Sequence, residues 1–269
     1  EFAVYSAAPF SPAPVASDIQ TFAGKRENYT IAKLSAGYLV NDMTKNSDVV
    51  VVKNKKQIRF DDVTVNLTLA DLLNQVSAED LRSVIELYIA FFNRVPEADG
   101  LAYWLGELRD GKTLEQIANS FYQAAIYYSV QTDYSADMSD HDFVKVIYRA
   151  NELVRGVSKG SMIQSMLNSA RTYANDPVWK FVPALLDGKL QVAMTFSVNH
   201  ALSYLSPEQS ILKTMAIAAA VTAASTAEAL KLVPVKDLTT NLAAPPNAGN
   251  FAGVCTPAME KGWARGHLD

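Results

Sequence analysis

Histidine and cysteine are the scarcest of the side chains with which this chain could carry out chemistry. It has three histidines, His141, His200 and His267, and one cysteine, Cys255. The histidines lie about 60 residues apart, and none has a second histidine four residues later, the spacing at which a helix presents two zinc ligands. Cys255 has no second cysteine with which to form an internal disulfide. These residues therefore predict no metal site, no cofactor site and no catalytic residue.

Catalytic sequence motifs point the same way. The chain has no Gly-x-Ser-x-Gly elbow, no phosphate-binding Walker loop and no dinucleotide fingerprint. Its 28 aspartates and glutamates leave a glycosidase-like carboxylate pair open, because no spacing singles out two of them. We predict a protein that is not an enzyme, and a carboxylate-dependent hydrolase is the least favoured alternative.

Four aspartates lie close together between two expected helices: Asp133, Asp137, Asp140 and Asp142. Oxygen ligands grouped in a loop could bind calcium, which takes about six to eight of them. The spacing does not match an EF-hand loop, because no glycine stands at the sharp turn and no glutamate closes the loop. We predict a solvated loop whose aspartates cap the next helix and no cofactor, with calcium at the Asp133–Asp142 loop as the alternative.

The overall charge and hydropathy exclude two classes of protein. A net charge of −4 argues against a general nucleic-acid binder, which usually carries a basic stripe. The longest apolar stretch, Met215 to Ala224, is too short for a transmembrane segment, which needs roughly 20 residues. The chain begins with Glu1 and a stretch rich in alanine, serine and proline. A removed signal peptide would explain this start, and so would a trimmed chain.

The periodicity of apolar residues changes near Thr68. Before it, strand-forming residues alternate between turn signals, with a hairpin expected around Asp61-Asp62. After it, apolar residues recur at helical spacing. The expected domains are a leader (1–17), a small β module (18–70), a helical domain (71–240) and an irregular tail (241–269). The predicted fold is mainly α with a small N-terminal β module, α+β overall, and its helical part is a bundle of about seven to nine helices.

Local signals predict where several helices begin. Ser77 with Asp80, and Thr113 with Gln116, have the spacing of a capping box. Ser206 is expected to cap a helix that has Pro207 at its first position. Further helices are expected over residues 177–186, 191–202 and 226–232.

Aromatic residues are frequent in the helical part, and at helical spacing such residues are more often core than ligand platform. Tyr103 and Trp104 are adjacent, so they cannot both face the same side of a helix. We expect one of them to anchor the core and the other to lie at a groove or surface. Stacking of a sugar on this Tyr103–Trp104 platform is the alternative.

Residues 87–111 contain an ordered set of aromatic, charged and turn residues. They are Leu87, Tyr88, Phe91, Phe92, Arg94, Pro96, Asp99, Gly100, Leu101, Tyr103, Trp104, Leu108 and Gly111. The set resembles a bacterial helical domain-of-unknown-function family (DUF 4214 type). Asn93 stands where the family more often has glycine, and Glu97 where it has aspartate. The resemblance implies a structural motif made by Tyr88, Arg94, Pro96, Asp99 and Gly100, with no catalytic residue in it.

The segment 56–65 resembles an RTX-protein-like β hairpin, found at the ends of secreted proteins, although the calcium-binding repeats of those proteins are missing. Together the two resemblances imply a bacterial extracellular protein, secreted or at the cell surface, without established activity. We predict a non-catalytic structural, adhesive or self-assembling role, with the chain itself as partner in a homo-oligomer. The alternative is a carbohydrate-binding module with a surface polysaccharide as partner. We also expect residues 1–17 or 241–269 to contact a neighbouring subunit or their own domain.

Overall fold

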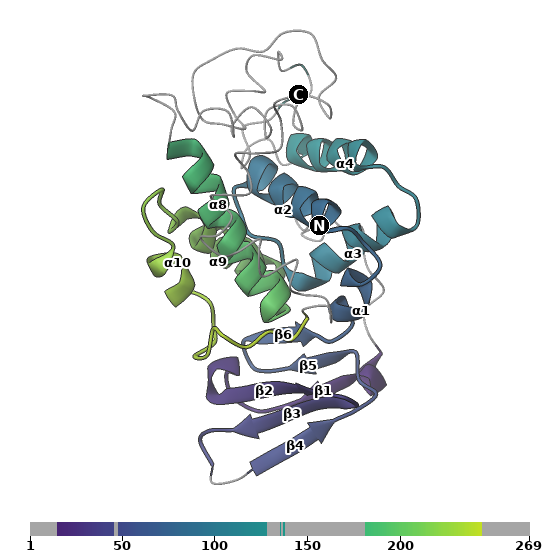
Figure 1. The fold of residues 1–269 in the computed structure, drawn as a ribbon, viewed down its shortest axis with the longest axis vertical. Coiled ribbons are helices and arrows are strands. Elements are labelled where there is room, and N and C mark those ends of the chain that lie inside the picture. The colour runs from purple at the N-terminus through teal and green to yellow at the C-terminus, as the bar shows by residue number, and fades with distance from the viewer. Residues whose placement is uncertain (1–14, 46–47, 128–134, 136, 138–180, 244–269) are drawn as a thin grey trace, which may run out of the picture.

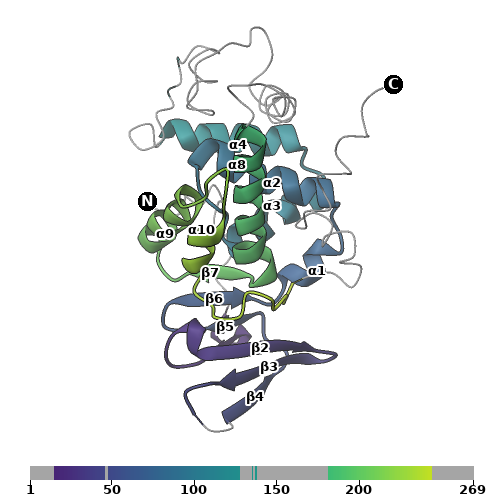
Figure 2. The same cartoon turned by 60° about the vertical axis from the view of Figure 1, so that its left-hand side comes forward.

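The computed structural model describes residues 15–45, 48–127, 135, 137 and 181–243 (Figure 1). The strands gather at one end of the molecule, and the helices lie over them (Figures 1 and 2). The strands are β1 (Ile19–Thr21), β2 (Tyr29–Leu34), β3 (Gly37–Asp42), β4 (Asp48–Val52), β5 (Gln57–Arg59), β6 (Val63–Asn66) and β7 (Leu202–Tyr204). The α-helices are α1 (Leu69–Leu73), α2 (Ala78–Phe92), α3 (Ala98–Arg109), α4 (Leu114–Tyr127), α8 (Phe181–Ala193), α9 (Pro207–Ala219) and α10 (Ala227–Lys231).

The strands form two separate sheets. One has four strands in the order β1-β5-β6-β7, in which β1 is parallel to β5 and the other pairs are antiparallel. The other has three antiparallel strands in the order β2-β3-β4. The hairpin expected around Asp61-Asp62 is confirmed, because β5 and β6 pair across it with Ile58 opposite Val65.

The expected fold class, mainly α with a helical bundle of seven to nine helices, is wrong. The described residues contain seven α-helices and two sheets, so the protein is of mixed α and β class. Strand β7 lies within the stretch expected to be helical and pairs with β6, with Leu202 opposite Val65. The sequence did not predict β7, because three residues are too few to show the alternation of a strand and because the partner strand β6 lies far away in the sequence. The proposed domain boundaries stay a prediction.

The capping signals are confirmed. The Ser77 hydroxyl accepts a hydrogen bond from the Asp80 N–H, and the Asp80 carboxylate accepts one from the Ser77 N–H at the start of α2. Thr113 and Gln116 make the same reciprocal pair before α4. The Ser206 hydroxyl accepts from the N–H of Gln209 at the start of α9. Each bond satisfies a backbone donor that the first turn of a helix leaves without a partner.

The expected helix over 191–202 differs from the structure. Helix α8 continues to Ala193, and a π-helical turn, η5 (Met194–Asn199), follows it. Ala201 then has a positive φ of 51°, which turns the chain into β7. The Thr195 hydroxyl donates back to the Gln191 carbonyl, so a side chain competes with the backbone where the helix changes its winding. In this region η5 packs against α3 and β7.

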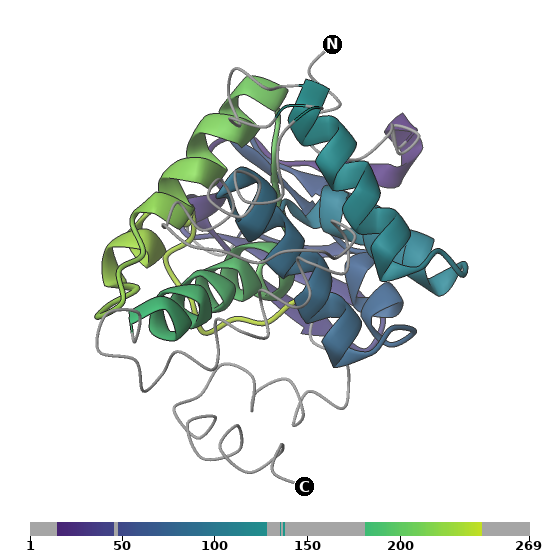
Figure 3. The same cartoon turned by 90° about the horizontal axis from the view of Figure 1, so that it is seen from above.

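Helix α2 lies at the centre of the helical layer and packs against α3, α4 and α8 (Figure 3). One continuous hydrophobic core joins this layer to both sheets. None of the helices in the described part of the chain is long and apolar enough to cross a membrane. Residues 1–14 and 244–269 lie outside the described residues, so the expected contacts of the chain ends stay a prediction.

Candidate functional site

The turn between α2 and α3 holds the residues of the family-like motif. It begins at Asn93, which ends α2 in the left-handed conformation with a φ of 47°. Arg94 follows and is buried, with its guanidinium 5.7 Å from the centre of the Tyr88 ring and 3.9 Å from the Glu97 carboxylate. The aromatic face and the carboxylate offset part of the free-energy cost of removing the guanidinium from water. This turn therefore places a charged group in the core rather than in a cleft.

The two carboxylates of the turn bind other elements. The Glu97 carboxylate accepts hydrogen bonds from the Tyr204 N–H of β7, at 2.6 Å, and from the Ser210 hydroxyl of α9. The Asp99 carboxylate accepts from the Asn66 side-chain amide at 2.7 Å, at the end of β6. Burial raises the pKa of both carboxyl groups, while these hydrogen bonds act in the opposite direction. Glu97 and Asp99 thus connect α3 to the four-stranded sheet and α9.

The remaining residues of the motif strengthen the same joint. The Pro96 carbonyl accepts a 2.6 Å hydrogen bond from the Ser197 hydroxyl of η5. Gly100 is buried in the first turn of α3. The Asn66 amide oxygen accepts hydrogen bonds from the backbone N–H groups of Thr68 and Leu69, so the residue that binds Asp99 also caps α1. These contacts connect the turn to η5, β6 and α1, and the structural role of the motif stays a prediction.

Tyr103 and Trp104 occupy different environments. Trp104 is 1% exposed and lies 5.3 Å from Phe121, measured between ring centres, in a cluster that also holds Tyr88. Tyr103 is partly exposed and meets Trp104 edge to face at 4.9 Å. Only Tyr103 has a surface that a ligand could reach in this conformation. The platform therefore stays a prediction, and in this conformation it consists of Tyr103.

His200 is the histidine that the structure describes. It is fully buried between η5 and β7, and its ring nitrogens make no hydrogen bond of good geometry with the described residues, although the Leu238 backbone lies near the ring. Burial, and then the positive charge of Arg26, lower the pKa of His200 to about 4, while the Leu238 backbone and the charge of Asp237 act in the opposite direction. The neutral ring is a core residue. His141, His267 and Cys255 lie outside the described residues.

The aspartates considered for calcium are described only at Asp137, which is exposed. Asp133, Asp140 and Asp142 lie outside the described residues, so neither the solvated loop nor the calcium site is tested. Within residues 15–45, 48–127 and 181–243, no three histidine, cysteine or acidic side chains come together in a way that could hold a metal ion.

The sequence analysis expected strands in the region of the three-stranded sheet, but it did not predict which face and which edge of this sheet are exposed. Its last strand, β4, is a sheet edge, and among the described residues no strand pairs with its outer side. Val49 and Val51 on this strand are each 48% exposed, whereas Val52 is buried. The run Asp48-Val-Val-Val-Val indicated a strand, but a run of one residue type has no alternation to show which face is buried.

The outer face of this sheet carries no charge. The strand register places the following residues on it: Thr30, Ala32 and Leu34 of β2, Leu39 and Asn41 of β3, and Val49 and Val51 of β4. The opposite face carries Tyr29, Ile31, Tyr38 and Val40, which belong to the core. We call the outer face together with the free edge of β4 the open sheet. An uncharged, partly apolar surface beside unpaired backbone groups can take up another strand.

Comparison with known proteins adds no relative: no family model, no curated protein and no solved structure matches the chain.

Proposed function

We propose that this chain is a non-catalytic structural or adhesive protein, secreted or at the cell surface, that self-assembles through the open sheet. The observation that carries the proposal is the free edge of β4 with its two exposed valines. Soluble proteins usually protect such edges with lysine, proline, a bulge or a covering loop. The expected location rests on the resemblance of residues 87–111 to a bacterial domain family and of residues 56–65 to secreted proteins.

A second copy of the chain is the partner that this edge fits. Two β4 strands can pair antiparallel about a two-fold axis with Val50 opposite Val50 of the second copy. Val49 of one copy then lies opposite Val51 of the other, on the outer face, so all four exposed valines become cross-strand neighbours. Such pairs contribute roughly 0.2–1 kcal/mol each. The pairing joins two three-stranded sheets into one continuous sheet of both copies.

Charge favours the same partner. The seven residues of the outer face are uncharged, so this face offers nothing to a nucleic acid, an anionic lipid surface or a charged polymer. Edge-to-edge pairing sets the two outer faces side by side and brings no charged residue of these faces together, while the charged residue of β4, Asp48, belongs to the other face and pairs with Lys45. A homo-oligomer therefore uses the surface better than a partner recognised by its charge.

Light scattering of the full chain tests the proposal. The wild type is expected to scatter as a dimer or larger assembly, and Val51→Lys to scatter as a monomer, because an edge lysine cannot enter the paired strand without desolvating its charge. The matched control is Leu212→Lys, since Leu212 is 70% exposed on α9, away from the open sheet. A monomeric wild type, or a Leu212→Lys variant that dissociates equally, would contradict assembly through this sheet.

A further inference from the structure

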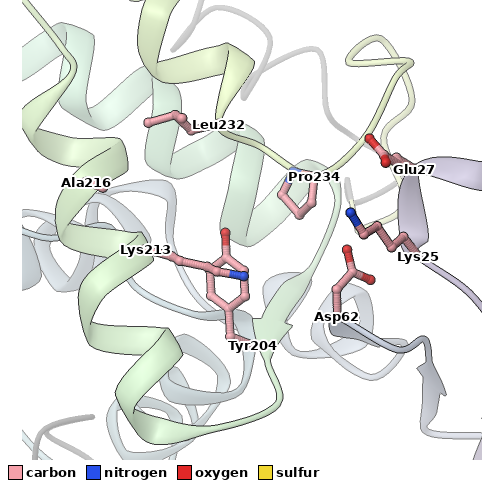
Figure 4. Close-up of a pocket in the computed structure, with 8 residues that line it drawn as sticks. All are labelled: Lys25, Glu27, Asp62, Tyr204, Lys213, Ala216, Leu232 and Pro234. Atoms are coloured by element: carbon pink, nitrogen blue, oxygen red, sulfur yellow. The ribbon is translucent and has the colours of Figure 1, made fainter.

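A pocket of about 320 Å³ lies where the helices meet the β strands. It is lined by Lys25, Glu27, Asp62, Tyr204, Lys213, Ala216, Leu232 and Pro234 (Figure 4). Its volume falls at the lower end of the range for small-molecule sites, roughly 300–1,000 Å³. The lining comes from five parts of the chain: η3 (Arg26–Asn28) with the residue before it, the β5–β6 turn, β7, α9 and the segment after α10. The proposed assembly surface contributes no residue to it.

Two lysines, Lys25 and Lys213, line the pocket together with the carboxylates of Glu27 and Asp62 (Figure 4). Among the described residues, neither lysine forms an ion pair within 4 Å. The Lys213 ammonium sits 4.8 Å from the centre of the Tyr204 ring, which fixes its side chain across the pocket floor (Figure 4). A ligand carboxylate placed between the two ammonium groups would form charge-assisted hydrogen bonds with both.

The rest of the lining supplies hydrogen-bond acceptors and an apolar wall. The Glu27 and Asp62 carboxylates accept hydrogen bonds only, and Asp62 uses one oxygen for the Arg26 N–H at 2.9 Å. The Tyr204 hydroxyl points toward Leu232 and Pro234 in the middle of the pocket (Figure 4). Phe196 stacks on the Tyr204 ring at 5.5 Å and holds it in place.

A ligand that satisfies this lining has an anionic group, several hydroxyl donors and an apolar face. A sugar ring that carries a carboxylate combines all three. We propose that the pocket binds an acidic saccharide of the uronic acid class. Its carboxylate lies between Lys25 and Lys213, its hydroxyls donate to Glu27 and Asp62, and its C–H face lies on Pro234 and Leu232. Binding here requires no assembly, so it is independent of the proposed function.

Calorimetric titration of the full chain with trigalacturonate tests this site, and the methyl-esterified trisaccharide is the matched ligand. The ester keeps the sugar scaffold and removes the charge. We expect the acid to bind and the ester to bind at least tenfold more weakly, which corresponds to about 1.4 kcal/mol. Lys25→Met and Lys213→Met should each weaken binding of the acid about tenfold or more. Both side chains are exposed, so the fold tolerates the change.

The control variant is Lys33→Met, an exposed lysine on β2 that does not line the pocket. It should bind the acid like the wild type. The monomeric Val51→Lys variant should also bind unchanged, which separates this site from the assembly surface. Absence of binding, equal binding of acid and ester, or an equal loss in Lys33→Met would overturn the proposal.

Discussion

The two sheets of this protein are built from similar residues and differ in what surrounds them. In the four-stranded sheet, Val63 and Val65 of β6 are fully buried beneath the helices. In the three-stranded sheet, Val49 and Val51 of β4 are half exposed. The edges differ as well: β1 and β7 have three residues each, while β2 has six and β4 has five. A short edge strand has few unpaired backbone groups with which another strand could form hydrogen bonds, and a longer valine-rich edge strand has more.

The difference shows that valine content alone does not make a strand structural. Strand β6 is covered because the turn after α2 binds it through Asp99 and Asn66, and because β7 arrives from distant sequence. Strand β4 lies at the far end of the molecule from the helices (Figure 1). The four-stranded sheet is thus buried and contributes to the stability of the fold, whereas the three-stranded sheet has an exposed surface that another molecule could contact.

The largest expected effect tests whether the helical cover of the four-stranded sheet is structural. Trp104→Ala empties a buried site in α3 and should lower the free energy of unfolding by about 3–5 kcal/mol. Tyr103→Ala, at the partly exposed neighbour, should cost clearly less. Urea unfolding of both variants measures the difference. An unchanged stability of Trp104→Ala together with loss of glycan binding would instead make Trp104 part of a ligand platform.

A second test measures how stability depends on pH, because the buried His200 in the covered part of the molecule should make stability fall at acidic pH. Unfolded histidine has a pKa near 6.5, and that of His200 in the folded protein is about 4. Between these values the unfolded state binds more protons, so stability is full above pH 6.5 and falls as the pH drops to about 4. The loss should be on the order of 3 kcal/mol.

His200→Leu is expected to remove this part of the pH dependence and to change stability at pH 7 only slightly, because the buried ring nitrogens make no well-formed hydrogen bond and have only the Leu238 backbone near them. Urea unfolding at pH 4.5 and pH 7 measures it. Glu97 and Asp99, whose raised pKa values act in the opposite sense, remain in both proteins and cancel in the comparison. An identical pH dependence in wild type and variant would show that His200 is accessible to protons in the folded state.

Local features of the fold could be predicted from the sequence, and long-range ones could not. The capping boxes at Ser77 and Thr113 depend on residues three positions apart, and the β5–β6 hairpin depends on one turn. Strand β7 depends on β6, more than a hundred residues earlier, so no local window contains the signal. The fold class was therefore wrong where pairing at long range decides the structure.

The candidate sites follow the same division. The motif residues Arg94 and Asp99 were identified by their order in the sequence, but their contacts with Glu97 and Asn66 required the fold. The exposure of Val51 could not be predicted, because four consecutive valines have no alternation between faces. The pocket at Tyr204 is formed by five separate parts of the chain, and no single motif joins them.

The smallest expected effect is the most direct test of the comparison, because it makes the same substitution in both sheets. Val65→Ala removes two methyl groups from a fully buried position and should lower the free energy of unfolding by about 1.5–3 kcal/mol. Val51→Ala removes the same groups from a half-exposed position and should change it by no more than about 0.5 kcal/mol. The measurement is urea unfolding at a protein concentration low enough to keep the chain monomeric, since assembly would otherwise add to stability. When the measurement is repeated at high protein concentration, the free energy lost by Val51→Ala should increase, while that lost by Val65→Ala should not. The reason is that only the open sheet gains contacts in the assembly. Equal costs for the two variants at low concentration would mean that β4 is covered in solution, and the contrast between the two sheets would then disappear.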